Sequence, residues 1–365
     1  MGTVRLHRLG IDEVLARLTP FDAVIDARSP AEHALDHLPG ALNWPVLDDE
    51  ERRIVGTEYT QLSAFEARKR GAVLAARNIA RHLEREGPAL APGWKPLVYC
   101  WRGGQRSGSL ALVLAQVGFE VHVLEGGYRA FRRRVLADLD DAGAGLDFRV
   151  LCGRTGTGKS RLLQALARSG AQVLDLEALA EHRGSVLGAV PDRPQPSQKT
   201  FETRLWHALR GFEPTRPVFV ESESRTIGRL RLPETLLQRM RAAPCLRVEM
   251  ELPARVALLR EEYAHFVADT AALCARLDAL REARGHEGVD SWQALARAGR
   301  IDELVAALLE THYDPVYLRS MARNYARFEQ AHEVVVDSGS PDVLARAAAA
   351  VVELSCIKPE APGST

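Results

Sequence analysis

The loop of residues 153–160 is the sequence feature that most constrains the fold, because GRTGTGKS matches the pattern G-x-x-x-x-G-K-[ST] in full. It follows an apolar run at 148–152 and precedes a helical pattern at 161–168. In such a strand–loop–helix unit, successive backbone N–H groups can wrap a diphosphate, with Lys159 bridging its oxygens and Ser160 able to hold Mg²⁺. The motif therefore predicts an α/β domain that binds phosphate groups. Its candidate phosphate-binding residues are Gly153, Arg154, Thr155, Gly156, Thr157, Gly158, Lys159 and Ser160.

Length and composition indicate the general class of protein. The 365 residues suffice for two domains, each with its own core. Lys and Arg (48) balance Asp and Glu (48), so any nucleic-acid surface must be a local patch. No apolar stretch reaches the roughly 20 residues of a membrane span, and residues 1–8 lack the apolar segment of a secretory signal. The five cysteines are scattered without a C-x-x-C pair, which argues against a disulfide framework and a structural zinc site. We expect a reduced, cytoplasmic protein with no membrane partner.

Apolar runs of strand length alternate with helical patterns along the chain, which is typical of parallel sheets built from βαβ units. The polar, glycine-containing stretch 138–147 interrupts this alternation, and we place the domain boundary there. The sequence thus predicts an α/β protein with a parallel-sheet domain over 1–140, a second α/β domain with a helical C-terminal part over 141–357, and a disordered tail over 358–365. The expected strands are 23–27, 97–100, 121–124, 148–152, 172–176, 217–220, 246–252 and 333–337.

A second strand–loop–helix unit, at residues 97–107, carries a cysteine where its strand ends. Cys100 is expected at the carboxyl end of a buried parallel strand, the edge at which open α/β sheets bind ligands. The loop that follows can direct N–H groups at one point, and its arginines and the next helix add positive charge. These features favour thiolate over thiol, so we expect an activated nucleophile facing an anion-binding loop. The loop residues concerned are Arg102, Gly103, Gly104 and Arg106.

Acidic residues follow two expected strands of the second domain, where a carboxylate that holds Mg²⁺ beside a phosphate loop is usually found. Asp175 and Glu221 are both placed for this role. The guanine-reading motif Asn-Lys-x-Asp does not occur, so a GTPase is not expected. Further candidates near the phosphate are His182, Arg183 and Arg225, for which a purely structural role in a loop or on a solvated face is an equal alternative.

Three segments resemble the sequence signatures of a rhodanese domain, a family that transfers sulfur through a persulfide on a loop cysteine. They are Asp26-Ala-Arg28-Ser-Pro30, His37-Leu-Pro-Gly-Ala-Leu-Asn43 and the Cys100 loop. The resemblance implies a structural ion pair between Asp26 and Arg28. Five residues separate Cys100 from Arg106, where an ordinary rhodanese loop has four; C-x5-R is also the spacing of cysteine phosphatases. The wider loop suggests an incoming group larger than a bare sulfur atom.

A rhodanese-like domain followed by a P-loop NTPase-like domain is similar to the tRNA 2-selenouridine synthase family. The resemblance implies replacement of sulfur by selenium in wobble 2-thiouridine of tRNA, with selenophosphate as the donor. It also implies transfer of a geranyl group from geranyl diphosphate to the same sulfur, which makes that sulfur a better leaving group. Shorter matches in the same order are Trp44-Pro45, Gly56-Thr-Glu-Tyr59, Glu125-Gly-Gly-Tyr-Arg129, Asp175-Leu-Glu177, His182-Arg-Gly-Ser185, Gln198-Lys-Thr-Phe-Glu202, Glu221-Ser-Glu-Ser-Arg225 and Tyr313-Asp-Pro-Val-Tyr317.

The implied co-substrates fit the two loops. Selenophosphate is a tetrahedral anion suited to the Cys100 loop, and geranyl diphosphate offers a diphosphate to the phosphate loop. The resemblance implies no bound organic cofactor, and it implies an enzyme that produces selenophosphate as a partner. It also implies that Gly71 borders the site of the prenyl group. A tRNA substrate requires a basic surface, and binding to such a surface would depend strongly on salt. The densest cluster of arginines in the sequence is a candidate for this surface, and an ordinary charged helix face is an equal alternative interpretation of it. That cluster contains Arg129, Arg132, Arg133 and Arg134.

Two other functions remain open from the sequence. One is a C-x5-R phosphatase fused to a kinase-like P-loop domain, although no general acid is evident near the loop. The other is a nucleotide-gated tRNA-binding adaptor with a vestigial first domain. Such a vestigial domain would have little need to keep the loop cysteine, its two glycines and its closing arginine together.

Overall fold

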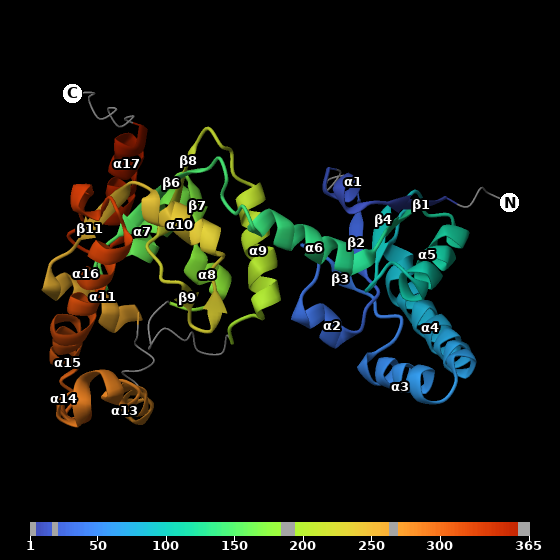
Figure 1. Cartoon of the computed structure of the whole chain (residues 1–365), viewed down its shortest axis with the longest axis horizontal. Coiled ribbons are helices and arrows are strands. Elements are labelled where there is room, and N and C mark those ends of the chain that lie inside the picture. Colours follow the sequence, from blue (N-terminus) through green and yellow to red (C-terminus); the bar gives the residue numbers. More distant parts are fainter. Residues whose placement is uncertain (1–4, 17–20, 184–193, 263–268, 357–365) are drawn as a thin grey trace. The chain divides into compact units, whose positions relative to one another are not determined.

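The computed structural model describes residues 5–16, 21–183, 194–262 and 269–356. The chain forms two compact units (Figure 1): unit 1 is Met1–Asp140 with Pro196–His207, and unit 2 is Asp141–Gln195 with Ala208–Thr365. The segment 196–207 interrupts unit 2 in the sequence but packs with unit 1, an arrangement that no sequence pattern predicted. The expected tail at 358–365 lies outside the described residues.

Unit 1 is built on a five-stranded parallel sheet with the order β1-β5-β4-β2-β3. Its middle strand β4 is buried along its whole length, as its continuous apolar sequence predicts. The edge strands β1 and β3 were not predicted, because they are mostly exposed and lack a continuous apolar run. The strands are β1 (Leu6–Leu9), β2 (Ala23–Asp26), β3 (Leu42–Asn43), β4 (Pro96–Tyr99) and β5 (Val121–Leu124).

Helices enclose this sheet and supply much of its core. Leu110 and Leu114 of α5 pack with Ile25, Val98 and Trp44, and α5 ends at Gly118, whose φ of 113° lies in the left-handed region that favours glycine. The helices of unit 1 are α1 (Ile11–Ala16), α2 (Pro30–Leu35), α3 (Asp49–Gln61), α4 (Ala64–Glu86), α5 (Gln105–Val117), α6 (Gly127–Leu139) and most of α9 (Gln198–Arg210), with a 3₁₀ turn η1 (Gly87–Ala89).

Unit 2 contains a second five-stranded parallel sheet, in the order β12-β11-β6-β8-β7, with β6 in the middle. A short antiparallel pair, β9 with β10, lies apart from it. The α/β fold class predicted from the alternating patterns is thereby confirmed. The strands are β6 (Asp147–Cys152), β7 (Gln172–Leu174), β8 (Pro217–Glu221), β9 (Thr226–Ile227), β10 (Leu230–Arg231), β11 (Cys245–Glu249) and β12 (His332–Val335).

The helices of unit 2 form two groups. Helices α7 and α17 pack against the sheet, while α13, α14 and α15 share a small apolar core of their own around Trp292. None of the helices in the described ranges is long and apolar enough to span a membrane. The helices are α7 (Lys159–Arg168), α8 (Leu176–Ala180), α10 (Glu234–Ala242), α11 (Leu252–Glu262), α13 (Thr270–Asp278), α14 (Arg281–Arg297), α15 (Ile301–Leu308), α16 (Asp314–Asn324) and α17 (Pro341–Cys356), with a π-helical turn η2 (Leu309–Tyr313) and a 3₁₀ turn η3 (Phe328–Gln330).

Candidate active sites

Cys100 directly follows β4, at the carboxyl edge of the sheet of unit 1, and is 3% exposed. The first turn of α6 holds its loop in place: the Tyr128 N–H donates to the Cys100 carbonyl at 2.8 Å. Both Gly103 (φ 67°) and Gly127 (φ 56°) are required at this contact. A Cβ on Gly103 would lie 2.7 Å from the Leu124 carbonyl oxygen, and one on Gly127 would lie 2.2 Å from that of Cys100.

Ser107, in the first turn of α5, contacts the cysteine sulfur. Its fully buried hydroxyl lies 3.1 Å from Cys100 Sγ and 3.2 Å from the Gly104 carbonyl oxygen. Since a hydroxyl has one proton, Ser107 can donate to either the sulfur or the carbonyl. Ser107 was not among the residues predicted from the sequence, although a serine directly after the arginine that closes the loop was a usable signal.

The arginines of the loop differ in their surroundings. Arg106 donates to Glu32 of α2 at 2.5 and 3.3 Å, and Arg102 is exposed. Burial alone would raise the pKa of Glu32, but the hydrogen bond and charge of Arg106 outweigh it and lower that pKa. The positive charge expected from Arg106 is therefore offset by a carboxylate, and Arg102 is the loop arginine directed at solvent.

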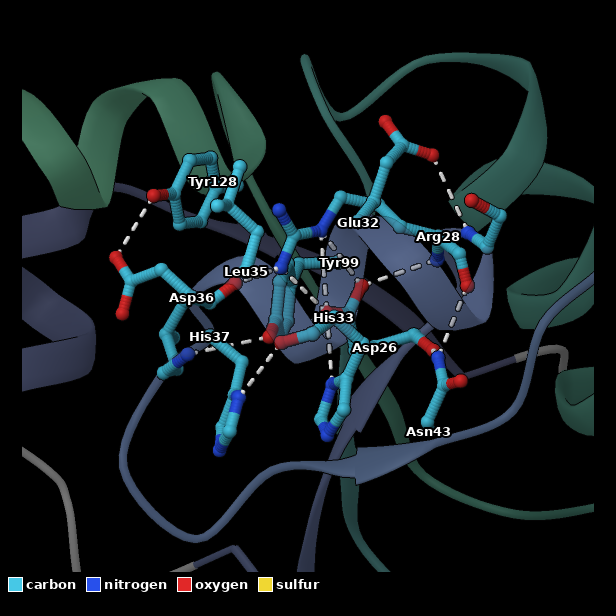
Figure 2. A network of polar contacts seen from close by, with 12 residues as sticks. Asp26, Arg28, Glu32, His33, Leu35, Asp36, His37, Asn43, Tyr99 and Tyr128 are labelled. Carbon is cyan, nitrogen blue, oxygen red and sulfur yellow. Dashed lines mark hydrogen bonds and ion pairs between the residues drawn. The ribbon is translucent and has the colours of Figure 1, made fainter. Parts of the chain in front are cut away.

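A buried polar network includes Tyr128, the residue whose N–H bonds the Cys100 carbonyl (Figure 2). Arg28, 1% exposed, donates through Nη2 to Asp26 at 2.6 Å and to the Asp36 carbonyl at 2.6 Å, and its guanidinium lies 4.1 Å from the Tyr128 ring centre. The Tyr128 hydroxyl donates to the Asp36 carboxylate at 2.7 Å. The implied structural ion pair between Asp26 and Arg28 is thus confirmed. Because Tyr128 also anchors the Cys100 carbonyl, the network fixes the position of the loop.

The phosphate loop of unit 2 follows β6 and opens α7. Positive φ angles at Gly156 (80°) and Gly158 (79°) suit glycine, and Gly158 is the N-cap of α7. The Lys159 ammonium donates to the carbonyl oxygens of Gly153 at 2.7 Å and Arg154 at 3.3 Å, so its side chain crosses the loop. The Gly153 N–H donates to the hydroxyl oxygen of Tyr317, a residue outside the candidate set.

A cavity of about 900 Å³ lies beside this loop. Thr155, Gly156, Lys159 and Ser160 line it, whereas the Arg154 guanidinium is held by Glu249 at 2.9 Å and does not line the cavity. The cavity also carries His182 and Arg183, as the sequence suggested. Arg225 does not reach it and pairs with Glu234 on the surface at 3.1 Å.

Three carboxylates converge in this cavity. The ligand oxygens of Glu177, Glu221 and Glu223 lie within 4.8 Å of one another, and the Ser160 hydroxyl donates to Glu177 at 3.2 Å. Glu221 ends β8 next to the phosphate-loop strand, as predicted, while Asp175 caps α8 by accepting the Ala178 N–H at 2.8 Å. The sequence analysis missed Glu177 and Glu223 as site residues, although each lies two residues beyond a predicted carboxylate.

Burial and mutual repulsion make these carboxylates hard to ionise. Burial, followed by the charges of its neighbours, raises the pKa of Glu177 to about 9 and that of Glu223 to about 8. Burial likewise raises the pKa of Glu221, against the opposing charge of Lys159. One oxygen of Glu221, Oε1, is buried without a hydrogen-bond partner in the part of the chain that the structure describes. An all-oxygen set of this kind suits a hard divalent cation.

Gly71 and two of the four predicted arginines of α6 make contacts within unit 1. A Cβ on Gly71 would lie 3.4 Å from Val55, so this glycine sits where α4 packs on α3. Arg132 pairs with Glu202 of α9, and Arg134 pairs with Asp12 and Asp138. The remaining two arginines of the predicted cluster, Arg129 and Arg133, are exposed.

The folds and loops define a rhodanese-like domain joined to a phosphate-loop domain. The Rhodanese-like domain family matches residues 11–134, and the tRNA 2-selenouridine synthase AAA domain family matches residues 146–286. The tRNA 2-selenouridine synthase of Marinobacter nauticus is 33% identical over 350 residues, covering 88% of this chain and 92% of the relative. The same enzyme from Alcanivorax borkumensis is 32% identical, covering 82% and 90% of the two chains. The chain therefore belongs to the tRNA 2-selenouridine synthase family and is an enzyme of this type.

Proposed function

We propose that this enzyme replaces the sulfur of wobble 2-thiouridine in tRNA by selenium, with selenophosphate as donor, through an intermediate geranylated from geranyl diphosphate. The names of the relatives support the overall conversion. One observation supports the division of the chemistry: the same chain carries a cysteine loop at the end of β4 and a phosphate loop with its cavity at the end of β6.

In unit 1, Cys100 and its loop position selenophosphate, the selenium donor. The exposed Arg102 attracts the anion, and Ser107 is within hydrogen-bond distance of the sulfur, where its proton can stabilise negative charge. Arg106 positions the loop through Glu32 rather than adding a free charge.

In unit 2, Lys159 and the backbone of the phosphate loop hold the diphosphate. The residues fit Mg²⁺, because Ser160, Glu177, Glu221 and Glu223 present oxygen atoms close together and Glu221 has a buried oxygen to satisfy. The cation supplies positive charge that offsets both the carboxylates and the diphosphate. Because burial raises the pKa values of these three groups, cation binding would have to displace their protons.

The tRNA surface includes Arg129 and Arg133, since their side chains are exposed while Arg132 and Arg134 are engaged in ion pairs. Glutamate substitution at both exposed residues lowers tRNA affinity and flattens its dependence on salt. The substrate places the reaction in the cytoplasm, and an enzyme that makes selenophosphate must supply the donor.

The proposal is tested by mass spectrometry of nucleosides from 2-thiouridine tRNA incubated with the protein, selenophosphate, geranyl diphosphate and Mg²⁺. We expect 2-selenouridine with the native chain and, when selenophosphate is omitted, the geranylated nucleoside. Cys100→Ser should lose selenium incorporation and keep geranyl transfer, whereas Lys159→Ala should lose geranyl transfer. Equal loss of both activities in folded Cys100→Ser would refute this division of roles.

A further inference from the structure

The cavity beside the phosphate loop has a second wall, formed by α16 and its flanking residues. The cavity-lining positions recur at intervals of three and four, the spacing of one helix face. The π-helical turn η2 directly precedes α16, and π-helical turns are frequent at functional sites. The wall consists of Tyr313, Val316, Tyr317, Ser320, Met321 and Tyr325.

This α16 wall differs chemically from the phosphate-loop side. Val316 is 46% exposed, so an aliphatic side chain lies open at the cavity surface, and Leu259 of α11 lines the cavity as well. Two tyrosine hydroxyls of the wall are already engaged with backbone groups. That of Tyr317 accepts from the Gly153 N–H, and that of Tyr325 donates to the Glu223 carbonyl at 3.0 Å. The wall therefore offers a ligand the exposed aliphatic side chain of Val316 and the partly exposed rings of Tyr313 and Tyr317, together with the exposed Ser320, while Met321 and Tyr325 are 2% and 4% exposed.

A buried arginine fixes the distance between this wall and the phosphate loop. Arg255, 1% exposed, donates to the Thr155 carbonyl at 2.9 and 2.7 Å and to the Asp314 carboxylate at 2.8 and 2.6 Å. Thr155 belongs to the phosphate loop, and Asp314 is the first residue of α16. A ligand whose diphosphate is held by the loop thus meets the apolar wall at a defined position.

We propose that the α16 wall binds the hydrocarbon chain of a prenyl diphosphate whose diphosphate occupies the phosphate loop, with Val316 as a contact residue that favours longer chains. This inference rests on the proposed function and adds the place where the prenyl chain lies. It also moves the prenyl site from Gly71, where the sequence resemblance suggested it, to unit 2. A nucleoside triphosphate would set a polar ribose against Val316 and find the hydroxyls of Tyr317 and Tyr325 already engaged.

The test is calorimetry on the full chain with Mg²⁺, titrated with inorganic pyrophosphate, dimethylallyl diphosphate, geranyl diphosphate and ATP. Affinity should rise from pyrophosphate through dimethylallyl to geranyl diphosphate, by about tenfold or more overall, because each isoprene unit buries apolar surface. Val316→Asn should weaken geranyl diphosphate binding about tenfold and leave pyrophosphate binding unchanged. Leu318→Asn is the matched control: Leu318 is 45% exposed on α16 but does not line the cavity, so both affinities should persist.

The results separate the inference from the proposed function. If the native chain geranylates tRNA but Val316→Asn and Leu318→Asn bind geranyl diphosphate equally well, the wall assignment is wrong and the function stands. If the native chain neither transfers geranyl nor prefers geranyl diphosphate over pyrophosphate, the geranyl part of the function falls together with the wall assignment. A Val316→Asn variant that weakens ATP alone would show that the wall takes a nucleoside, and this too overturns the inference.

Discussion

Replacing Asp26 by Asn should destabilise unit 1 strongly, because it removes the negative partner of a buried guanidinium. Asp26 is fully buried and accepts from Arg28 through the backbone N–H at 3.0 Å, Nε at 2.9 Å and Nη2 at 2.6 Å. Removing one partner of a buried ion pair costs about 3–5 kcal/mol, since the other charge stays buried and uncompensated. The neutral asparagine keeps the size of the side chain, so loss of packing contributes little.

Urea unfolding followed by tryptophan fluorescence measures this free energy, because four of the five tryptophans lie in unit 1. Glu50→Gln is the matched control: it breaks the Arg53–Glu50 pair, whose side chains are 66% and 63% exposed, and should hardly change the unfolding free energy, because water screens exposed ion pairs. A cost for Asp26→Asn as small as that of the control would refute the reasoning that Arg28 depends on this carboxylate.

The same variant predicts a pH dependence. Burial raises the pKa of Asp26, but hydrogen bonds from His33 and Arg28 outweigh it, so the folded pKa lies below the model-compound value of 3.8. A carboxyl whose pKa is lowered on folding stabilises the protein above its unfolded pKa and loses that contribution as pH falls through the folded value. The difference in unfolding free energy between the native chain and Asp26→Asn should therefore be constant above about pH 5 and shrink below pH 3.8. A difference that does not vary with pH would contradict the assignment.

Three further predictions concern the two loops. Ser107→Ala should slow alkylation of Cys100 by a small reagent about tenfold at neutral pH, because a hydrogen bond to a charged group is worth about 1.5–3 kcal/mol. Ser109→Ala is the control: the Ser109 hydroxyl bonds a backbone carbonyl instead of the sulfur, so this variant should react at the native rate. Chelating Mg²⁺ should weaken pyrophosphate binding at least about tenfold in calorimetry, and equal affinities with and without chelator would exclude the cation. Mg²⁺ affinity should rise with pH up to about 9, because Glu177 must lose a proton to act as a ligand, and Glu221→Gln should weaken it; a flat profile would contradict the carboxylate site.

Most of the fold could be predicted because buried parallel strands have a simple sequence pattern. The expected runs at 97–100, 121–124 and 148–152 correspond to β4, β5 and β6, which are buried at nearly every residue. What was missed has a physical reason. The edge strand β1 is mostly exposed and therefore has no apolar run, and the pairing of 196–207 with unit 1 depends on tertiary contacts that no local pattern encodes.

Motifs located the two candidate sites, but they did not show how side chains from other parts of the chain change the charge at each site. The role of Arg106 depends on Glu32, which is 74 residues away in the sequence. Likewise, the sequence could not show which of Asp175 and Glu221 joins the carboxylate cluster. The structure shows that the Asp175 side chain accepts the Ala178 N–H as the N-cap of α8. Residues brought to a site by a distant helix, such as Tyr317, require the structure.

The two loops share a position in their sheets and differ in charge, and this difference suits two different anions. β4 and β6 are each the third strand of a five-stranded parallel sheet, so each loop opens at the carboxyl edge of a middle strand. In unit 1 a carboxylate offsets Arg106 and a hydroxyl contacts the sulfur, which leaves a buried, nearly neutral setting for a thiol. In unit 2 three carboxyl groups with raised pKa values lie in the cavity that Lys159 also lines, and a cation that replaces their protons would bring the positive charge that a diphosphate requires. In the function proposed above the two steps use different loops, and a cation bound beside Cys100 would pair with the selenophosphate anion that this cysteine is proposed to position.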